Sequence, residues 1–512
     1  MISEAPRNDD VESESRRSTP ASKASYPDKV KHHRKDSPAS TSKNVRRSQG
    51  EKEPDYGGGR LNEIITNAVI LLLGWCAAWA IAGPEVLPGG SLFGLIIIFY
   101  SAILGGKLLE CISIPSVPPL PPLLGMLLAG FAIRNIPFLN KIVSVNSAWS
   151  STLRNMALTV ILVRAGLGLD PQVLKTMKGV CLRLSIGPCL TESLSAAIIS
   201  HYLLGFPWEW GFLVGFVVGA VSPAVVVPSM IMLQEKGYGI QKGIPTLLMA
   251  ASSLDDILAI TGFNICISLI FSTGTVMHNI LGSVRDIIIG VLIGAALGIF
   301  VRYFPSRDQE HVHLKRAFLI LGLCISAVLG SIRVGLHAAG GLCTLVLTFM
   351  AGLSWAAEKV SVQHVIAVAW DVFQPLLFGL VGSEINVSAL ETNALGTAVA
   401  TVILAVSARV FFTFLLMSFA GFNIKEKLFI ALAWLPKATV QAVLGPLAYE
   451  TVRAINKFEL EQYSKDVMTV AFLAILITAP NGALIIGILG PKVLTRHDPR
   501  DFKGELMTVL HH

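Results

Sequence analysis

Two adjacent carboxylates, Asp255 and Asp256, lie inside the apolar stretch Ala250–Ile260 (AASSLDDILAI). An ionisable side chain in hydrocarbon costs roughly 2.5–3.5 kcal/mol on insertion scales, so such residues are candidates for a functional site. Neighbours on a helix are about 100° apart, so the two acids are expected to have different roles. An alkali cation needs hard oxygen ligands, and burial disfavours an ionised carboxylate, so one desolvated aspartate can take either a cation or a proton. The pair therefore predicts exchange of a small cation for protons, with a purely structural salt bridge as the alternative.

Two proline-interrupted stretches lie midway along other apolar runs. The first contains Ser222, Pro223 and Pro228, and the second contains Pro436 and Thr439. Proline removes backbone hydrogen bonds, and the freed carbonyls must be satisfied by ions, side chains or a polar cavity. Broken helices at corresponding places in two halves of a chain point to an inverted-repeat transporter, although either proline alone is more often a simple kink.

Three further charges fall within apolar runs. Lys437, on the second broken helix, is predicted to pair with Asp255 when no ion is bound. Glu192 and Arg409 would each be costly to bury alone but would neutralise one another as a pair. Their contact is a hypothesis, and a structural lock between domains is the alternative to a direct role in transport.

Membrane-spanning helices are the elements that must position these residues. The chain has 512 residues, of which 53% are hydrophobic and only 15% charged. Apolar runs long enough to cross about 30 Å of hydrocarbon recur along it, and dividing them at Pro, Gly and charge clusters gives about fourteen helices. The fold class expected is an all-α polytopic membrane protein, with two crossing broken helices in an inverted repeat.

Three regions follow from this division. Residues 1–60 are polar and of mixed charge and are predicted to be a disordered cytosolic tail, residues 61–496 a transmembrane antiporter domain, and residues 497–512 a short cytosolic tail. An even number of spans places both termini on one side. The short loops assigned to that side are richer in Lys and Arg, as the positive-inside rule requires of cytosolic loops. Asn386 begins a glycosylation triplet in a loop predicted to lie outside.

Composition also excludes several classes of partner and cofactor. The net charge of +7 comes with a tail of mixed sign, so no nucleic-acid partner is expected. The seven cysteines lie in or beside predicted spans without CxxC spacing, and the histidines lack ligand spacing, so neither a cofactor nor a resident metal is predicted. The only metal ions expected are transported Na+ or Li+ at Asp256 and Asp255.

Three motifs together resemble the cation/proton antiporter superfamily, specifically its animal NHA branch, the sodium/hydrogen exchanger 9B subfamily. They are SSLDDI around Asp255, SPAVVVP from Ser222 and LPKATVQ around Lys437. The resemblance covers the chain from Leu61 to Arg496, and the closing Leu510-His511-His512 is closer to the testis and sperm-type member. Bacterial relatives carry a lysine where Arg409 stands, a departure that bears on the number of protons exchanged.

The resemblance implies a homodimer in membrane lipid, with a dimerisation subdomain and a mobile core subdomain that works by elevator-like alternating access. It implies that Asp256 is the main carboxylate for the ion and the proton, that Asp255 pairs with Lys437, and that Arg409 bonds Glu192. It also implies residence in the plasma membrane, with the sperm flagellum as one expected location and mitochondrial and endosomal membranes as alternatives.

Two other functions compete with transport. An intramembrane aspartyl protease also needs two acids, but on separate helices, and the stretch from Gly166 to Asp170 has one residue too many for its Gly-x-Gly-Asp motif. A transport-silent scaffold or ion sensor on an antiporter frame is the other alternative. It would be favoured by the loss of an expected ionisable residue, and all of them are present.

Overall fold

The computed structural model describes residues 59–111, 120–169, 177–271, 276–306, 308–336, 339–355, 358–386 and 392–496. Both predicted tails, apart from residues 59 and 60, lie outside these ranges, as do Asp170 and the two residues that follow Asn386. The chain divides into two units, Met1–Ala68 and Val69–His512, and each is described by itself. The first unit contributes only the first turns of α1 (Gly59–Ala82) to the description.

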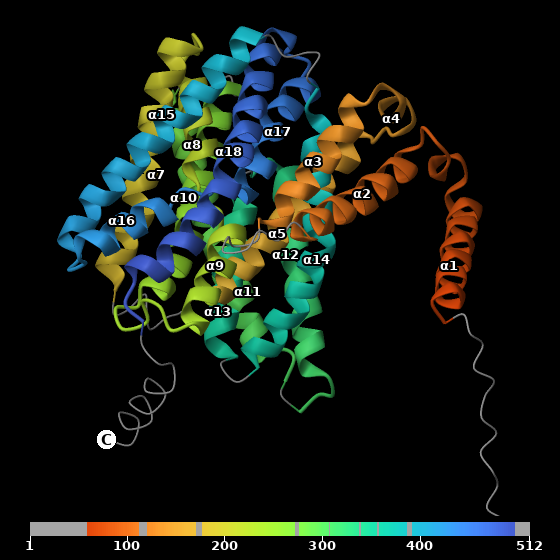
Figure 1. Ribbon diagram of the computed structural model, residues 1–512, viewed down its shortest axis with the longest axis horizontal. Helices are drawn as coiled ribbons and strands as arrows, with labels where there is room; N and C mark the ends of the chain where they lie inside the picture. Colours follow the sequence, from red (N-terminus) through yellow and green to blue (C-terminus); the bar gives the residue numbers. More distant parts are fainter. Residues whose placement is uncertain are drawn as a thin grey trace, which may run out of the picture. The chain divides into compact units, whose positions relative to one another are not determined.

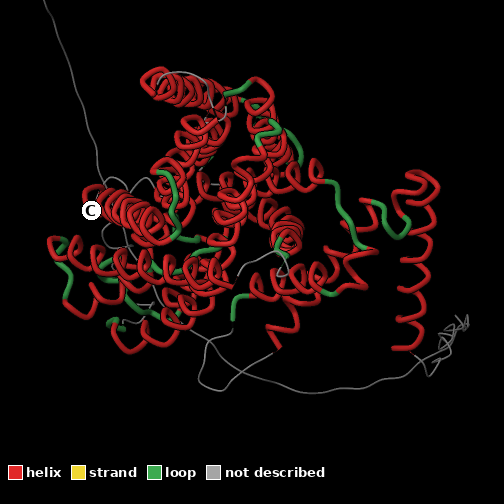
Figure 2. Tube along the Cα trace, turned by 90° about the horizontal axis from the view of Figure 1, so that it is seen from above, coloured by secondary structure: helices red, strands yellow, loops and turns green. Residues whose placement is uncertain are grey.

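Helices and loops make up the described part of the chain, with one isolated backbone bridge between Tyr238 and Arg496 and no strand (Figure 2). Ten helices there are long and apolar enough to cross a membrane, with α8 (Trp208–Gly219) and α9 (Pro223–Glu235) taken as one. Two shorter apolar helices are α3 (Pro122–Asn135) and α13 (Ala339–Ser354). The all-α fold class is confirmed. The predicted total of about fourteen crossings stays a prediction.

Contacts between helices divide the second unit into two groups. The first, which we call the site group, consists of α7 (Lys178–Leu203), α8 (Trp208–Gly219), α9 (Pro223–Glu235), α10 (Ile244–Phe271), α15 (Thr392–Leu416), α16 (Ile424–Ala433), α17 (Thr439–Ala454) and α18 (Glu461–Val493). Its two halves share one order, a long helix, a broken helix and a long helix, as an internal repeat requires.

The second, which we call the scaffold group, consists of α2 (Ser91–Cys111), α3 (Pro122–Asn135), α4 (Pro137–Ile142), α5 (Ser147–Gly168), α11 (Val276–Tyr303), α12 (Val312–Val334), α13 (Ala339–Ser354) and α14 (Lys359–Glu384). In Figure 1, α7, α15 and α16 lie on one side of this unit, and α2, α3 and α14 on the other. The groups meet where α5 and α14 pack on α17, α10 on α11, and α3 on α18.

Small residues allow the scaffold helices to approach closely. A side chain at Gly105 of α2 would collide with the backbone of Gly125 in α3, and one at Gly130 of α3 would collide with Gly379 in α14. Packing through small residues is the usual way for helices to associate in lipid, where apolar burial by itself gives little drive. The scaffold group therefore contains closely packed backbones beside the site group.

Candidate functional site

Both predicted breaks occur, and the two broken helices are tied to each other. The helix ends at Gly219 and resumes at Pro223, and again ends at Ala433 and resumes at Thr439. The Ser222 N–H donates to the Pro436 carbonyl at 2.8 Å, and the Thr439 N–H donates to Ser222 Oγ at 3.4 Å. The backbone groups freed in one break are thus satisfied partly by the other, which holds the two breaks side by side.

Proline and glutamine explain how the broken ends are tolerated. Pro223 is the first residue of α9, where its missing N–H costs nothing, and Pro228 lies one turn further inside that helix. The side chain of Gln441 donates from Nε2 to the carbonyls of Val217 and Ala220, both at 2.9 Å. These carbonyls end α8 and would otherwise be orphaned, so Gln441 caps one broken helix from the other.

Asp255 and Asp256 lie on α10, next to the breaks, and both are fully buried. Asp255 Oδ2 accepts from the Val221 N–H at 2.6 Å and from Arg409 Nη2 at 3.1 Å. Neither carboxylate oxygen of Asp256 has a hydrogen-bond partner among the residues that the structure describes. The two acids therefore have different surroundings, and Asp256 is the unpaired one.

Glu192 and Arg409 are in contact. Arg409 Nη1 donates to Glu192 Oε2 and to the Gly219 carbonyl, so the guanidinium also caps the end of α8. Arg409 additionally contacts Asp255, as an ion pair at 3.1 Å. One guanidinium thereby links α7, α8 and α10 to α15.

In this structure Lys437 pairs with Glu192, and its pairing with Asp255 in the ion-free state stays a prediction. Lys437 Nζ lies 2.6 Å from Glu192 Oε2, while Asp255 is held by Arg409 and by the Val221 N–H. The reason is that Glu192 lies between the two cations and accepts from both, a position that sequence spacing cannot reveal. The chain is held in place at this point by the Lys437 N–H, which donates to Thr478 Oγ1 at 2.8 Å.

Charge is unbalanced in this cluster. It contains three carboxylates, Glu192, Asp255 and Asp256, against two cations, Arg409 and Lys437, and all five side chains are fully buried. With every group ionised, the cluster carries one net negative charge. Burying an uncompensated charge is strongly unfavourable, so the cluster requires one more positive charge, which either a monovalent cation or a proton can supply.

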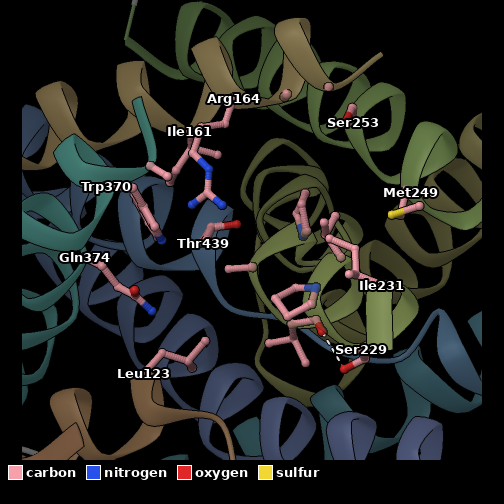
Figure 3. Close-up of a pocket in the computed structure, with 18 of the residues that line it drawn as sticks. Leu123, Ile161, Arg164, Ser229, Ile231, Met249, Ser253, Trp370, Gln374 and Thr439 are labelled. Atoms are coloured by element: carbon pink, nitrogen blue, oxygen red, sulfur yellow. Dashed lines mark hydrogen bonds between the residues drawn. The ribbon is translucent and has the colours of Figure 1, made fainter. Parts of the chain in front are cut away.

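A cavity of about 1100 Å³ lies at the interface between the two groups, beside the broken helices (Figure 3). It is lined by parts of α3, α5, α9, α10 and α14, with Pro223, Ser253 and Thr439 among its residues. Ser253 and Asp256 are three residues apart on α10 and so lie on the same helix face, one turn from each other. The cavity wall therefore includes a residue one helical turn from the unpaired carboxylate.

Sequence reasoning missed three features of this region. Arg164 and Trp370 both lie in the cavity wall (Figure 3). The Arg164 guanidinium is 5.5 Å from the centre of the Trp370 ring. Arg154 lies on the same helix and is 2% exposed. Both arginines fall in a predicted span, so the cost of intramembrane charge was the signal that could have found them. The capping role of Gln441 had no such signal.

Comparison with known proteins places these features in a family. The family model described as "Sodium/hydrogen exchanger, transmembrane" matches residues 95–490. The chain is 65% identical to the human sodium/hydrogen exchanger 9B1 over 455 residues, which cover 89% of this chain and 88% of that protein. It is 58% identical to human sodium/hydrogen exchanger 9B2 over 445 residues, which cover 86% and 83% respectively.

Solved structures give the same fold. The sodium proton antiporter MjNhaP1 of Methanocaldococcus jannaschii superposes with a TM-score of 0.64, over 79% of this chain and 98% of that one, at 20% sequence identity. This likeness supports the antiporter architecture, and the sequence matches establish the family. The chain belongs to the sodium/hydrogen exchanger family, integral membrane transporters rather than enzymes, and within it to the 9B subfamily.

Proposed function

We propose that the chain exchanges sodium or lithium for protons across a membrane, with Asp256 as the group for which the cation and the proton compete. The observation that carries this proposal is that both oxygens of the Asp256 carboxylate are buried and have no hydrogen-bond partner in the described part of the chain. The names of the relatives, sodium/hydrogen exchangers, support the same activity.

Competition follows from the charge of the cluster. When Asp256 is ionised, a bound monovalent cation neutralises the single excess negative charge. When Asp256 is protonated, the cluster is neutral and the cation loses its main ligand, so the two forms exclude each other. The Ser222 and Thr439 hydroxyls and the backbone carbonyls at the breaks are hard oxygen donors of the kind that alkali ions and Ca²⁺ prefer. The charge count favours one monovalent cation exchanged for one proton.

Alternating access completes the proposal. The site group would move as an elevator against the scaffold group, so that the cluster faces first the cavity and then the opposite side. The cavity is lined by helices of both groups, which supports this division of labour. We extend the proposal to a homodimer in the plasma membrane, with both termini cytosolic and the sperm flagellum as one location.

The test is exchange by purified protein in liposomes that contain a pH-sensitive dye. Outward and inward gradients of sodium, lithium and potassium would be imposed on wild type, on Asp256→Asn, and on Glu235→Gln as a control at an exposed carboxylate. We expect sodium- or lithium-dependent pH changes from wild type and Glu235→Gln and none from Asp256→Asn. Exchange that survives Asp256→Asn would rule out the site. No pH change from wild type with any of the three cations would instead favour the transport-silent scaffold.

A further inference from the structure

Arg154 forms an ion pair between the two helix groups. It belongs to α5 of the scaffold group, and its guanidinium contacts Glu450 of α17, which is in the site group. The same guanidinium lies 3.4 Å from Glu384 of α14, in its own group, and donates to Ser150 one turn earlier on α5. The arginine side chain is 2% exposed, whereas Glu450 and Glu384 are 14% and 30% exposed. The cluster is therefore a buried cation between two acids that lie closer to solvent.

This cluster and the cavity lie at opposite ends of one interface. The cavity wall takes Ile161, Arg164 and Gly168 from the last turns of α5, and Arg164 is about 15 Å along the helix from Arg154. The same division holds on α14, which lines the cavity with residues between Val360 and Gln374 and reaches the arginine only at its last residue.

Helix α17 and helix α3 follow the same pattern. From α17, the cavity touches Thr439, the first residue, and Glu450 comes three turns later. Toward the far end of α3, Phe131 stacks on Phe472 of α18 with ring centroids 5.4 Å apart. Among the described residues, the interface thus holds the cavity at one end, and at the other end it is closed by an ion cluster and an aromatic contact.

We propose that Arg154 is a positioning residue for transport. Its ion pair with Glu450 keeps this end of the interface closed, and the pair breaks each time the site group moves. This inference rests on the proposed alternating access. The Arg154–Glu450 ion pair can break because Glu384 belongs to the same helix group as Arg154 and stays beside it. The guanidinium, which can bind two carboxylates through its planar fork, therefore never becomes an unpaired buried charge when Glu450 departs.

The two acids provide a matched pair of variants. Glu450→Gln and Glu384→Gln each remove one carboxylate from the same guanidinium, but only Glu450 lies across the interface. The reporter is Ser150→Cys, since Ser150 is 1% exposed and directly contacts Arg154. It would be placed in a background in which the exposed native cysteines, Cys76 and Cys111, are replaced by serine.

Reaction of this cysteine with a water-soluble maleimide measures how often the closed end opens, because the rate follows the open population when reclosure is fast. We expect Glu450→Gln to raise the rate about fivefold or more, the lower range of typical coupling between conformational states. Glu384→Gln should leave the rate within about twofold of the background. Buried Cys266 should stay unreacted in every variant, which shows that the protein has not unfolded.

The proposed role of the Arg154–Glu450 ion pair is refuted if Glu450→Gln and the background react with maleimide at the same rate. It is also refuted if Glu384→Gln raises the maleimide reaction rate as much as Glu450→Gln does. Should Glu450→Gln not give folded protein, Arg154→Lys replaces it, because lysine keeps the charge without the fork and should raise the rate in the same direction. The readout does not depend on transport. If exchange depends on Asp256 but Glu450→Gln leaves the maleimide reaction rate unchanged, only the role of the Arg154–Glu450 ion pair is rejected. If the maleimide reaction rates are as expected but the protein shows no exchange, only the proposed function is rejected.

Discussion

Replacement of Arg409 by methionine removes the cation that joins the buried cluster. The charges in the structure determine how much the free energy of unfolding falls and how that decrease depends on pH. The guanidinium contacts Glu192, Asp255 and the Gly219 carbonyl, all within the protein interior. Without it, three carboxylates would face Lys437 alone, with two excess negative charges. Methionine is similar in length and apolar, so packing is largely kept.

Protonation limits the cost of this substitution. Keeping one extra carboxyl protonated costs about 4 kcal/mol at pH 7 and about 1.5 kcal/mol at pH 5, taking roughly 3.9 as the pKa of an aspartic acid in the unfolded chain and 1.36 kcal/mol per pH unit. The folded variant then binds one proton more than wild type. Its free energy of unfolding, compared with wild type, therefore rises as the pH falls, by about 1.4 kcal/mol per unit.

Thermal unfolding in detergent, followed by tryptophan fluorescence, measures this effect. For a protein of this size a loss of 1 kcal/mol lowers the midpoint by roughly 1–2 °C, so we expect a difference of about 4–8 °C at pH 7 and less than half of that at pH 5. The control is Arg183→Met, because the half-buried Arg183 makes only a 3.5 Å contact with the Leu416 carbonyl in the described structure. A deficit of Arg409→Met that is the same at both pH values would refute the charge count.

Two further predictions concern the broken helices. Gln441→Leu leaves two carbonyls at the end of α8 without the side-chain donor that lies 2.9 Å from each. It should lower the free energy of unfolding by roughly 2–4 kcal/mol in the same assay. An unchanged unfolding midpoint would contradict the capping role. Gly482→Ala places a methyl group against the Pro436 ring and should slow exchange in liposomes several-fold. The control is Gly322→Ala on α12, where the added methyl group meets open space and should leave the exchange rate unchanged. Equal exchange rates in the two variants would show that the position of Pro436 does not matter.

Much of the fold could be predicted because lipid leaves few choices. An apolar run that crosses hydrocarbon must satisfy its backbone internally, so hydrophobic length alone predicts helices, and proline within a run predicts a kink or a break. The breaks after Gly219 and Ala433 follow this rule, and the cost of intramembrane charge singled out the aspartate pair, Glu192, Lys437 and Arg409. These are local properties of the chain, and they do not depend on which helices become neighbours.

Which charge pairs with which was decided only by the tertiary structure. The ion pairs join residues more than a hundred and fifty positions apart, and small rotations of the helices determine whether Lys437 meets Asp255 or Glu192. The same packing leaves Asp256 without a hydrogen-bond partner among the described residues, joins Ser222 to Pro436, and sets Arg154 between Glu384 and Glu450. The sequence by itself determined which buried charges the chain must accommodate. Only the packing of the helices decided which of them are neutralised within the protein and which one is left for an ion or a proton.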